Sequence, residues 1–168
     1  MEGRRIVLGI DPGTAILGYG VVAVEGDELE VVDFGVLTTP ASDPLTSRLL
    51  TLFSGLIRVI EQRRPDEVAV EQLFFARNVG SALAVGHARG IALLAAAKSY
   101  LSVSEYTPMQ VKQAVAGYGK ATKKQVQGMV QVMLDLPAIP QPDDAADALA
   151  IAICHARWND QMGGRFSL

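Results

Sequence analysis

The stretch Ile6-Val7-Leu8-Gly9-Ile10-Asp11-Pro12-Gly13 decides the fold class of this 168-residue chain. An apolar run rich in Ile, Val and Leu predicts a buried strand, and the Pro-Gly pair after the acid predicts a turn that ends it. Alternation along the strand places Val7, Gly9 and Asp11 on one face. An acid at the exit of a buried strand costs desolvation energy unless a cation compensates it.

A second acid stands at the end of a second apolar run. Glu71 follows Val68-Ala69-Val70 and shares a strand face with Glu67 and Ala69. The residue before each acid on its own face is therefore very small, Gly9 in the first strand and Ala69 in the second. Small residues at these places predict that another element approaches the sheet closely.

The C-terminal segment supplies two more acids. Asp144 and Asp147 lie one helical turn apart in a segment otherwise built of Ala, Leu and Ile, and we expect both on the packing side of a helix over residues 143–158. Each acid has an ordinary alternative: Asp143 and Asp144 compensate the helix dipole, Asp11 forms the turn, and Glu71 pairs with an arginine. Because four acids converge on one predicted location, we favour a site for hard divalent cations, which oxygen ligands bind.

The remaining segments alternate between strand and helix patterns. We expect strands at 5–11, 18–24, 29–36, 67–71 and 102–106, and helices from Pro44 to about 65, from about 78 to 99, from Thr107, from Thr122 and over 143–158. Asp43 and Asn78 are the predicted N-caps of the first two helices, and Thr107 and Thr122 each begin a capping-box spacing.

This order of elements predicts an α/β fold. Short connections indicate an antiparallel meander of the first three strands, and each later strand, reached through a helix, adds in parallel by a right-handed crossover. The result is a mixed sheet with helices on both faces. We expect a single domain over residues 1–168, with 163–168 as a flexible tail.

The charge is distributed unevenly. The chain carries a net charge of −3, yet residues 72–134 hold seven lysines and arginines against one acid, Glu105. A solvated helix face is one explanation of such a segment. A phosphate-binding surface is the other, because it requires this excess of positive charge.

Composition excludes several classes of protein. The single cysteine, Cys154, excludes an internal disulfide and indicates a reducing, cytoplasmic compartment, with Cys154 as a core residue. Asp11 interrupts the only N-terminal apolar run, which excludes a secretory signal there. His87 and Arg89 interrupt the most apolar helical stretch, so we expect a soluble protein without a membrane span. We expect His87 and His155 to be solvated helix residues.

Four motifs, taken in order, resemble the RuvC family of Holliday junction resolvases, in the RNase H-like superfamily. They are Gly9-Ile10-Asp11-Pro12-Gly13-Thr14 followed by Gly18-Tyr19-Gly20, then Glu71-Gln72-Leu73-Phe74, Gln110-Val111-Lys112-Gln113 and Asp144-Ala145-Ala146-Asp147-Ala148-Leu149-Ala150. The match extends over nearly the whole chain. The resemblance implies an RNase H-like nuclease domain that nicks four-way junctions in recombination and repair.

The resemblance also implies roles for single residues. Asp11, Glu71, Asp144 and Asp147 would hold two Mg²⁺ ions, with Mn²⁺ as a substitute, and Asp11 is the best candidate to bridge them. The family has histidine at the position of Asp144 in some members. Lys112 would act beside the reacting phosphate and Lys123 would help to bind DNA. The other expected DNA contacts are Phe74, Arg77, Lys120 and Lys124.

Partners follow from the same resemblance. A four-way junction has two-fold symmetry, so paired nicks are most simply made by a homodimer, which is the family's state. The family works with a junction-binding tetramer and a ring motor. Gly80, Gly86 and Gly90 would allow close helix packing, either across a dimer or against the chain's own sheet. One of Phe74 and Phe75 would reach DNA bases while the other packs inside; our hypothesis is that Phe74 wedges between bases at the junction.

Two other functions remain open at this point. Asp11-Pro12-Gly13-Thr14 also resembles the first phosphate loop of actin-like and sugar-kinase ATPases, although the chain has neither the second domain nor the second loop of those proteins. A module that binds junctions without cutting them is the other alternative.

Overall fold

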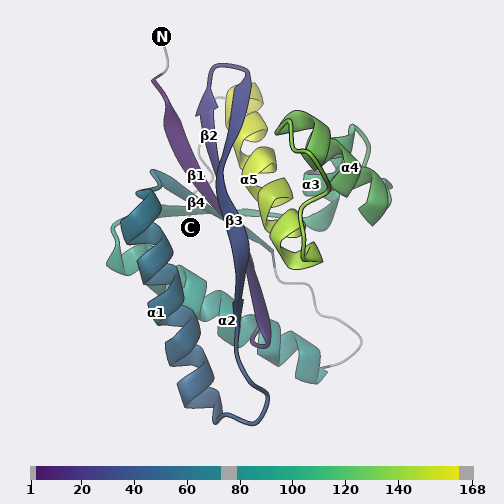
Figure 1. Cartoon of the computed structure of the whole chain (residues 1–168). Helices are drawn as coiled ribbons and strands as arrows, with labels where there is room; N and C mark the ends of the chain where they lie inside the picture. The colour runs from purple at the N-terminus through teal and green to yellow at the C-terminus, as the bar shows by residue number, and fades with distance from the viewer. Residues whose placement is uncertain (1–2, 73–78, 163–168) are drawn as a thin grey trace.

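The computed structural model describes residues 3–72 and 79–162, with side chains in the last helix described to residue 158. Its five strands form one sheet in the order β3-β2-β1-β4-β5 (Figure 1). The strands are β1 (Arg5–Asp11), β2 (Ile16–Glu25), β3 (Glu28–Thr38), β4 (Glu67–Glu71) and β5 (Ser102–Tyr106). The helices are α1 (Leu45–Arg63), α2 (Val79–Lys98), α3 (Pro108–Ala116), α4 (Lys123–Met133) and α5 (Asp143–Met162).

The sheet has the predicted mixture of directions. β1, β2 and β3 form an antiparallel meander, and β4 pairs in parallel with both β1 and β5. β4 and β5 have the predicted bounds, whereas β2 and β3 extend one to two residues further at each end. The predicted fold class, an α/β mixed sheet with helices on both faces, is therefore confirmed.

Alternation along β1 separates two apolar clusters. Leu8 and Ile10 lie in the cluster beneath α1 and α2, and Val7 lies in the cluster beneath α3, α4 and α5. Figure 1 shows this division, with α1 and α2 on one side of the sheet and α3–α5 on the other. Gly9 and Asp11 share the face of Val7, so they face α5.

Helix α5 lies directly on glycines of the sheet. A Cβ built on Gly9 would lie 2.1 Å from the carbonyl oxygen of Ala148, one on Gly18 would lie 2.0 Å from that of Asp144, and one on Gly20 would lie 2.7 Å from the nitrogen of Leu149. No side chain fits in these spaces. The close approach expected at Gly9 is confirmed, and it extends to β2.

The capping predictions had mixed outcomes. Thr107 and Thr122 form the two expected capping boxes. The prediction for α1 was wrong: Pro44 is itself the N-cap, without a side-chain cap bond, and the helix starts at Leu45. The Asp43 N–H is bonded to the carbonyl of Pro40, so Asp43 belongs to the preceding turn. Asn78 lies outside the described residues. The last helix, predicted to end at 158, continues to Met162.

The prediction for His155 was also wrong. Its side chain is 3% exposed and contacts Glu67, because α5 buries nearly its whole circumference between the sheet and helices α3 and α4. His87 is exposed, as expected. Cys154 is a buried free thiol in the core, also as expected, and burial raises its pKa to about 12.

Helix α2 keeps an apolar face in solvent. It buries Ala88, Ala92, Ala95 and Ala96, and Arg89 forms an ion pair with Glu105 of β5. Its exposed apolar residues are Val79, Leu83 and Leu94. By length and composition this helix is long and apolar enough to cross a membrane, the single such case in the described part of the chain.

Candidate active site

Asp11 and Glu71 end two neighbouring parallel strands. The register pairs Gly9 with Ala69 and Ile10 with Val70, so each acid stands one residue beyond the last of these pairs. Both side chains point to the α5 face of the sheet because they share faces with Gly9 and Ala69. The sequence prediction that these two acids emerge together is consistent with this register.

Helix α5 brings the other two acids to the same strand ends. The carbonyl of Asp144 lies on Gly18, and Gly18 is the residue that pairs with Asp11 across the sheet. Asp147 follows one turn later. The glycine on β2 thus allows the start of α5 to lie against the end of β1.

The electrostatics confirm that the acids are close. Burial, followed by the charges of Asp147, Glu71 and Asp144, raises the pKa of Asp11 from 3.8 to about 8. Burial and then Asp147 raise the pKa of Glu71, while Lys112 and Lys123 oppose that rise. A set of mutually repelling, half-buried carboxylates requires positive charge to ionise fully.

A cleft of about 260 Å³ opens beside these acids. It is lined by Glu71 and Asp147, by Lys112 of α3 and Lys123 of α4, and by apolar side chains. The acids are therefore next to two of the lysines singled out in the sequence. An anionic group that enters the cleft would meet both ammonium groups while it lies over the carboxylates.

Lys123 supplies the positive charge nearest to the acids. Its Nζ lies 3.3 Å from Asp147 Oδ2 and 3.6 Å from Asp143 Oδ2. Burial alone would lower the pKa of Lys123, but Asp147 and Asp143 outweigh burial and raise it. The only role predicted for Asp143 was compensation of the helix dipole. Its contact with Lys123 depends on the packing of α4 against α5, which no local pattern reports.

The donor set fits hard divalent cations. All four acids offer carboxylate oxygens, the ligands of Mg²⁺ and Mn²⁺, and the raised pKa of Asp11 indicates uncompensated negative charge. Among the described residues no three His, Cys, Asp or Glu side chains are already oriented around a common point for a metal ion. In this structure Lys123 supplies the positive charge beside the Asp147 carboxylate.

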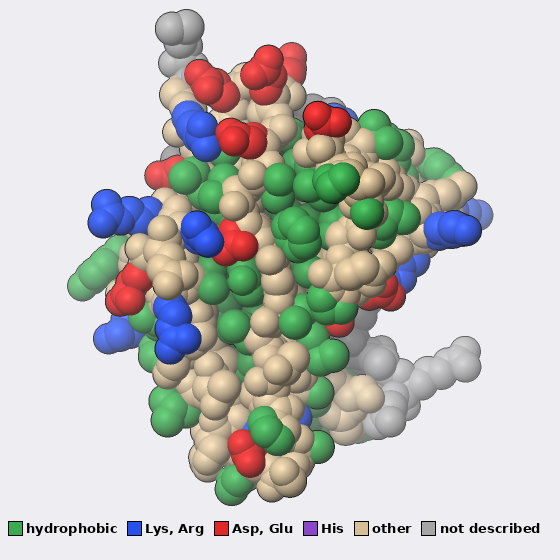
Figure 2. Space-filling model, in the orientation of Figure 1, with side chains coloured by type: hydrophobic (Ala, Val, Ile, Leu, Met, Phe, Trp, Pro, Cys, Tyr) green, Lys and Arg blue, Asp and Glu red, His purple; other side chains and the backbone are tan. Residues whose placement is uncertain are grey.

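Other predicted contacts lie elsewhere. Lys120 and Lys124 are exposed and do not line the cleft, although they lie on the same α3–α4 side. Figure 2 shows acids gathered at the top, over the β2–β3 turn, and basic side chains at the right, towards α3 and α4. Phe74, Phe75 and Arg77 lie outside the described residues, so their roles stay predictions.

Known proteins resemble this chain over nearly its whole length. Residues 7–155 match the family described as crossover junction endodeoxyribonuclease RuvC. A protein of that name from Desulforamulus reducens is 58% identical over 160 residues, 95% of this chain and 98% of the relative. Another from Chloroflexus aurantiacus is 60% identical over 149 residues, 89% of this chain and 91% of the relative.

Solved structures of Holliday junction resolvases resemble this chain as well. The structure of Thermus thermophilus RuvC in complex with Holliday junction substrate superimposes with a TM-score of 0.92 at 41% identity, covering 98% of this chain and 99% of that one. The yeast mitochondrial Holliday junction resolvase shares the fold, with a TM-score of 0.68 at 18% identity, covering 94% of this chain and 81% of that one. The chain therefore belongs to the RuvC family of crossover junction endodeoxyribonucleases, which have an RNase H-like fold.

Proposed function

We propose that this nuclease resolves four-way DNA junctions by paired symmetric nicks, with Asp11, Glu71, Asp144 and Asp147 holding two Mg²⁺ ions. Mn²⁺ is a plausible substitute because it accepts the same oxygen ligands. The observation that carries the proposal is that Glu71, Asp147, Lys112 and Lys123 line the same cleft. The relatives of this chain are named nucleases, which favours this proposal over an ATPase of the actin or sugar-kinase type.

The chemistry follows from the charges in the cleft. A phosphodiester resists attack because its own negative charge repels the nucleophile. Two bound divalent ions would neutralise that charge, activate water and stabilise the leaving oxygen. Asp11 is the best candidate to bridge the ions because all three other acids act on its pKa. Lys112 would hold a phosphate oxygen near Glu71, since its charge opposes the rise in the Glu71 pKa.

A homodimer would carry the two sites that paired nicks require. The apolar face of α2 supports this assembly, since Val79 and Leu83 are 74% and 58% exposed and a helix this apolar is ordinarily covered. A Cβ on Gly90 would meet nothing within 4 Å, so this glycine is not packed against the chain's own sheet. Sedimentation equilibrium of wild type against Leu83→Glu tests the assembly: a wild-type dimer and a monomeric variant are expected.

The cellular setting is inferred from the family and the substrate. We propose a cytoplasmic enzyme of recombination and repair that works with the junction-binding and branch-migration motor proteins of the same pathway. The buried free thiol of Cys154 is consistent with a reducing compartment.

The decisive experiment uses a synthetic four-way junction labelled on each strand in turn. With Mg²⁺ we expect nicks at symmetric positions in two opposing strands, and no cutting of a linear duplex of the same sequences. ATP should not be hydrolysed. Junction binding without cleavage in either Mg²⁺ or Mn²⁺ would favour the binding-only module.

Metal affinity should depend strongly on pH. The pKa of Asp11 is about 8 in the metal-free protein, so binding a cation must displace its proton at neutral pH. We expect affinity for Mn²⁺ to rise by up to ~10-fold per pH unit below that value and to level off above it. Electron paramagnetic resonance of free Mn²⁺ between pH 6 and 9 measures this. A flat profile would mean that Asp11 is not a ligand.

Lys112→Ala should affect both DNA binding and cutting. Loss of one phosphate contact is expected to reduce the salt slope of junction binding by roughly one unit, and single-turnover cleavage should slow because the ammonium lies in the cleft with Glu71. Lys98→Ala is the matched control, since Lys98 is exposed at the end of α2. Equal behaviour of the two variants would mean that Lys112 is merely part of a solvated face.

A further inference from the structure

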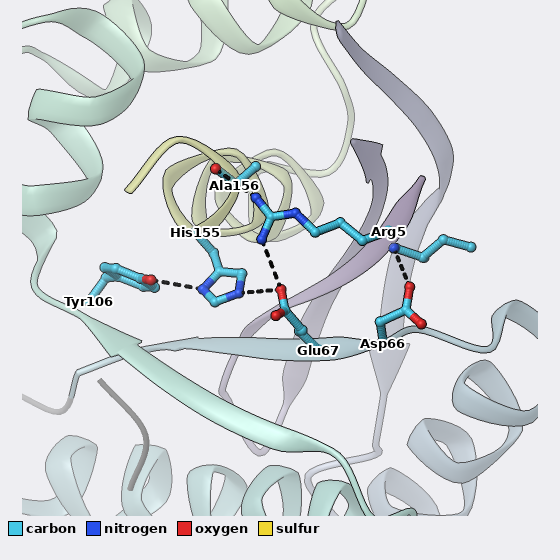
Figure 3. Close-up of polar contacts among 7 residues, drawn as sticks. Arg5, Asp66, Glu67, Tyr106, His155 and Ala156 are labelled. Atoms are coloured by element: carbon cyan, nitrogen blue, oxygen red, sulfur yellow. Dashed lines mark hydrogen bonds and ion pairs between the residues drawn. The ribbon is translucent and has the colours of Figure 1, made fainter. Parts of the chain in front are cut away.

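A second polar cluster lies beneath α5, apart from the acids described above (Figure 3). His155 Nε2 is 2.8 Å from Glu67 Oε2, and His155 Nδ1 is 2.8 Å from the Tyr106 hydroxyl. Arg5 donates to Glu67 Oε2 at 3.3 Å and to the carbonyl of Ala156 at 3.0 Å. With a carboxylate at Nε2, the ring donates there and accepts the Tyr106 proton at Nδ1. Strands β1, β4 and β5 are thus each tied to α5.

The cluster joins the same elements that carry the acids, at their other ends. Arg5 lies on the Asp11 face of β1, and Glu67 lies on the Glu71 face of β4. On α5, His155 stands eight residues after Asp147, about 12 Å along the helix axis. Along β1 and β4, one end of this interface therefore holds the acids and the other end holds Arg5 and Glu67. Tyr106, which pairs with Glu71 at the end of β5, reaches His155 through its hydroxyl.

Small residues lie between the two ends. The backbone of α5 at Ala148 and Ala152 rests on Gly9, where a Cβ would lie 2.1 Å from one and 2.8 Å from the other. Such contacts oppose separation of helix and sheet. On β1 they offer few protruding side chains to oppose a shift of the helix along the strand, and interlocking of side chains is what fixes the register of packed elements. The nearby interlocking contact is that of Leu149 with Gly20 on β2.

We infer that His155 and Glu67, supported by Arg5, set the axial position of α5 on the sheet and so place Asp144 and Asp147 against Asp11 and Glu71. His155 is on this view a positioning residue for the metal site. The inference rests on the proposed function of the four acids as metal ligands.

The geometry favours this role over simple stabilisation. The His155 side chain is 3% exposed and the Glu67 side chain 14%, so their hydrogen bond is shielded from water and strongly directional. Arg5 binds both partners of the interface, Glu67 on the sheet and the carbonyl of Ala156 on the helix. A shift of α5 by a fraction of a helical turn would break these bonds together.

The test compares metal affinity with thermal stability. His155→Phe keeps a ring but loses both hydrogen bonds, and we expect it to weaken Mn²⁺ binding by the free protein by roughly 10-fold or more, the range found for residues that orient metal ligands. The Mg²⁺ concentration that half-saturates cleavage should rise by a similar factor. Tyr106→Phe removes only one hydroxyl, so we expect a smaller shift in the same direction.

Two further variants separate positioning from stability. His155→Gln can still donate to Glu67 and should recover most of the Mn²⁺ affinity. Val130→Ala opens a gap in the same apolar cluster on α4 and should lower the melting temperature with Mn²⁺ affinity unchanged. Measurements are made on the free protein well below each variant's melting temperature, which keeps a folding defect apart from a binding defect.

The outcomes are distinct. If His155→Phe, or Tyr106→Phe should the first variant not fold, melts early yet binds Mn²⁺ like the wild type, the cluster only stabilises the fold and the inference is wrong. If Asp11→Asn also leaves Mn²⁺ affinity unchanged, the acids are not the ligands, and the proposed function fails together with the inference. Weakened binding in Asp11→Asn and His155→Phe, with Val130→Ala unaffected, is the expected result.

Discussion

Asp11→Asn should lower the rate of junction cleavage by roughly three orders of magnitude or more. Its affinity for the junction should stay close to that of the wild type. Asparagine has the shape of aspartate but lacks the charge that attracts divalent cations. Asp11 stands among the other three acids, whose charges all act on its pKa. We expect DNA binding to depend mainly on the lysines of α3 and α4, and the loss of one acid should reduce repulsion of phosphate. Cleavage and gel-shift assays on the same labelled junction measure both.

The stability of this variant supplies its control. In the metal-free protein the folded state binds the Asp11 proton more tightly than the unfolded state, because the pKa is about 8 rather than 3.8. Stability from this group is therefore fully present below about pH 4 and is lost as the pH rises through about 8. Asparagine does not ionise, so the variant does not lose stability as the pH rises. In EDTA at pH 8.5 its melting temperature should therefore be higher than that of the wild type. Wild-type cutting by Asp11→Asn would remove this residue from the site.

Gly9→Ala should damage the fold and the active site at the same time. The new Cβ would lie 2.1 Å from the carbonyl oxygen of Ala148, a backbone atom that no rotamer change can move. Helix α5 must therefore shift away from β1. We expect a loss of roughly 3 kcal/mol in the free energy of unfolding and about 10 °C in melting temperature. Cleavage by the folded fraction should fall sharply because Asp144 and Asp147 move with the helix.

Gly128→Ala is the matched control for that change. Gly128 lies within α4, and a Cβ there would meet nothing within 4 Å. Alanine in a helix interior is favoured over glycine by roughly 0.5–1 kcal/mol, so this variant should melt slightly later and cut normally. If Gly9→Ala had the same melting temperature and cleavage rate as Gly128→Ala, the close contact of α5 with Gly9 would be wrong.

Much of this fold is predictable because local patterns and tertiary structure agree. Strands at 67–71 and 102–106 have the predicted bounds, since each short apolar run ends beside polar or turn-forming residues. The tiny residues Gly9 and Ala69 correctly indicated the close approach of another element. The capping boxes at Thr107 and Thr122 were also found, because those bonds are made within four residues.

The errors arose where distant residues decide the outcome. The prediction that His155 is exposed to solvent was wrong. The residues around it on α5 are all buried, namely Ala152, Ile153, Cys154 and Ala156. This helix therefore has no polar face from which its orientation could be deduced. Its partner Glu67 lies 88 residues earlier in the chain. The pairing of Lys123 with Asp147 was likewise missed, because a charge count cannot tell an ion pair from a DNA contact.

The packing of α5 on the sheet has a consequence for biosynthesis. Asp11 and Glu71 leave the ribosome long before Asp144 and Asp147, which belong to the last helix of the chain. An unfinished polypeptide thus has half of the acids and an open groove over Gly9, Gly18 and Gly20 where α5 will lie. With the four acids as the proposed metal ligands, cleavage is expected only when translation has passed residue 147 and α5 has docked, so the linear order of the elements keeps a nascent chain inactive.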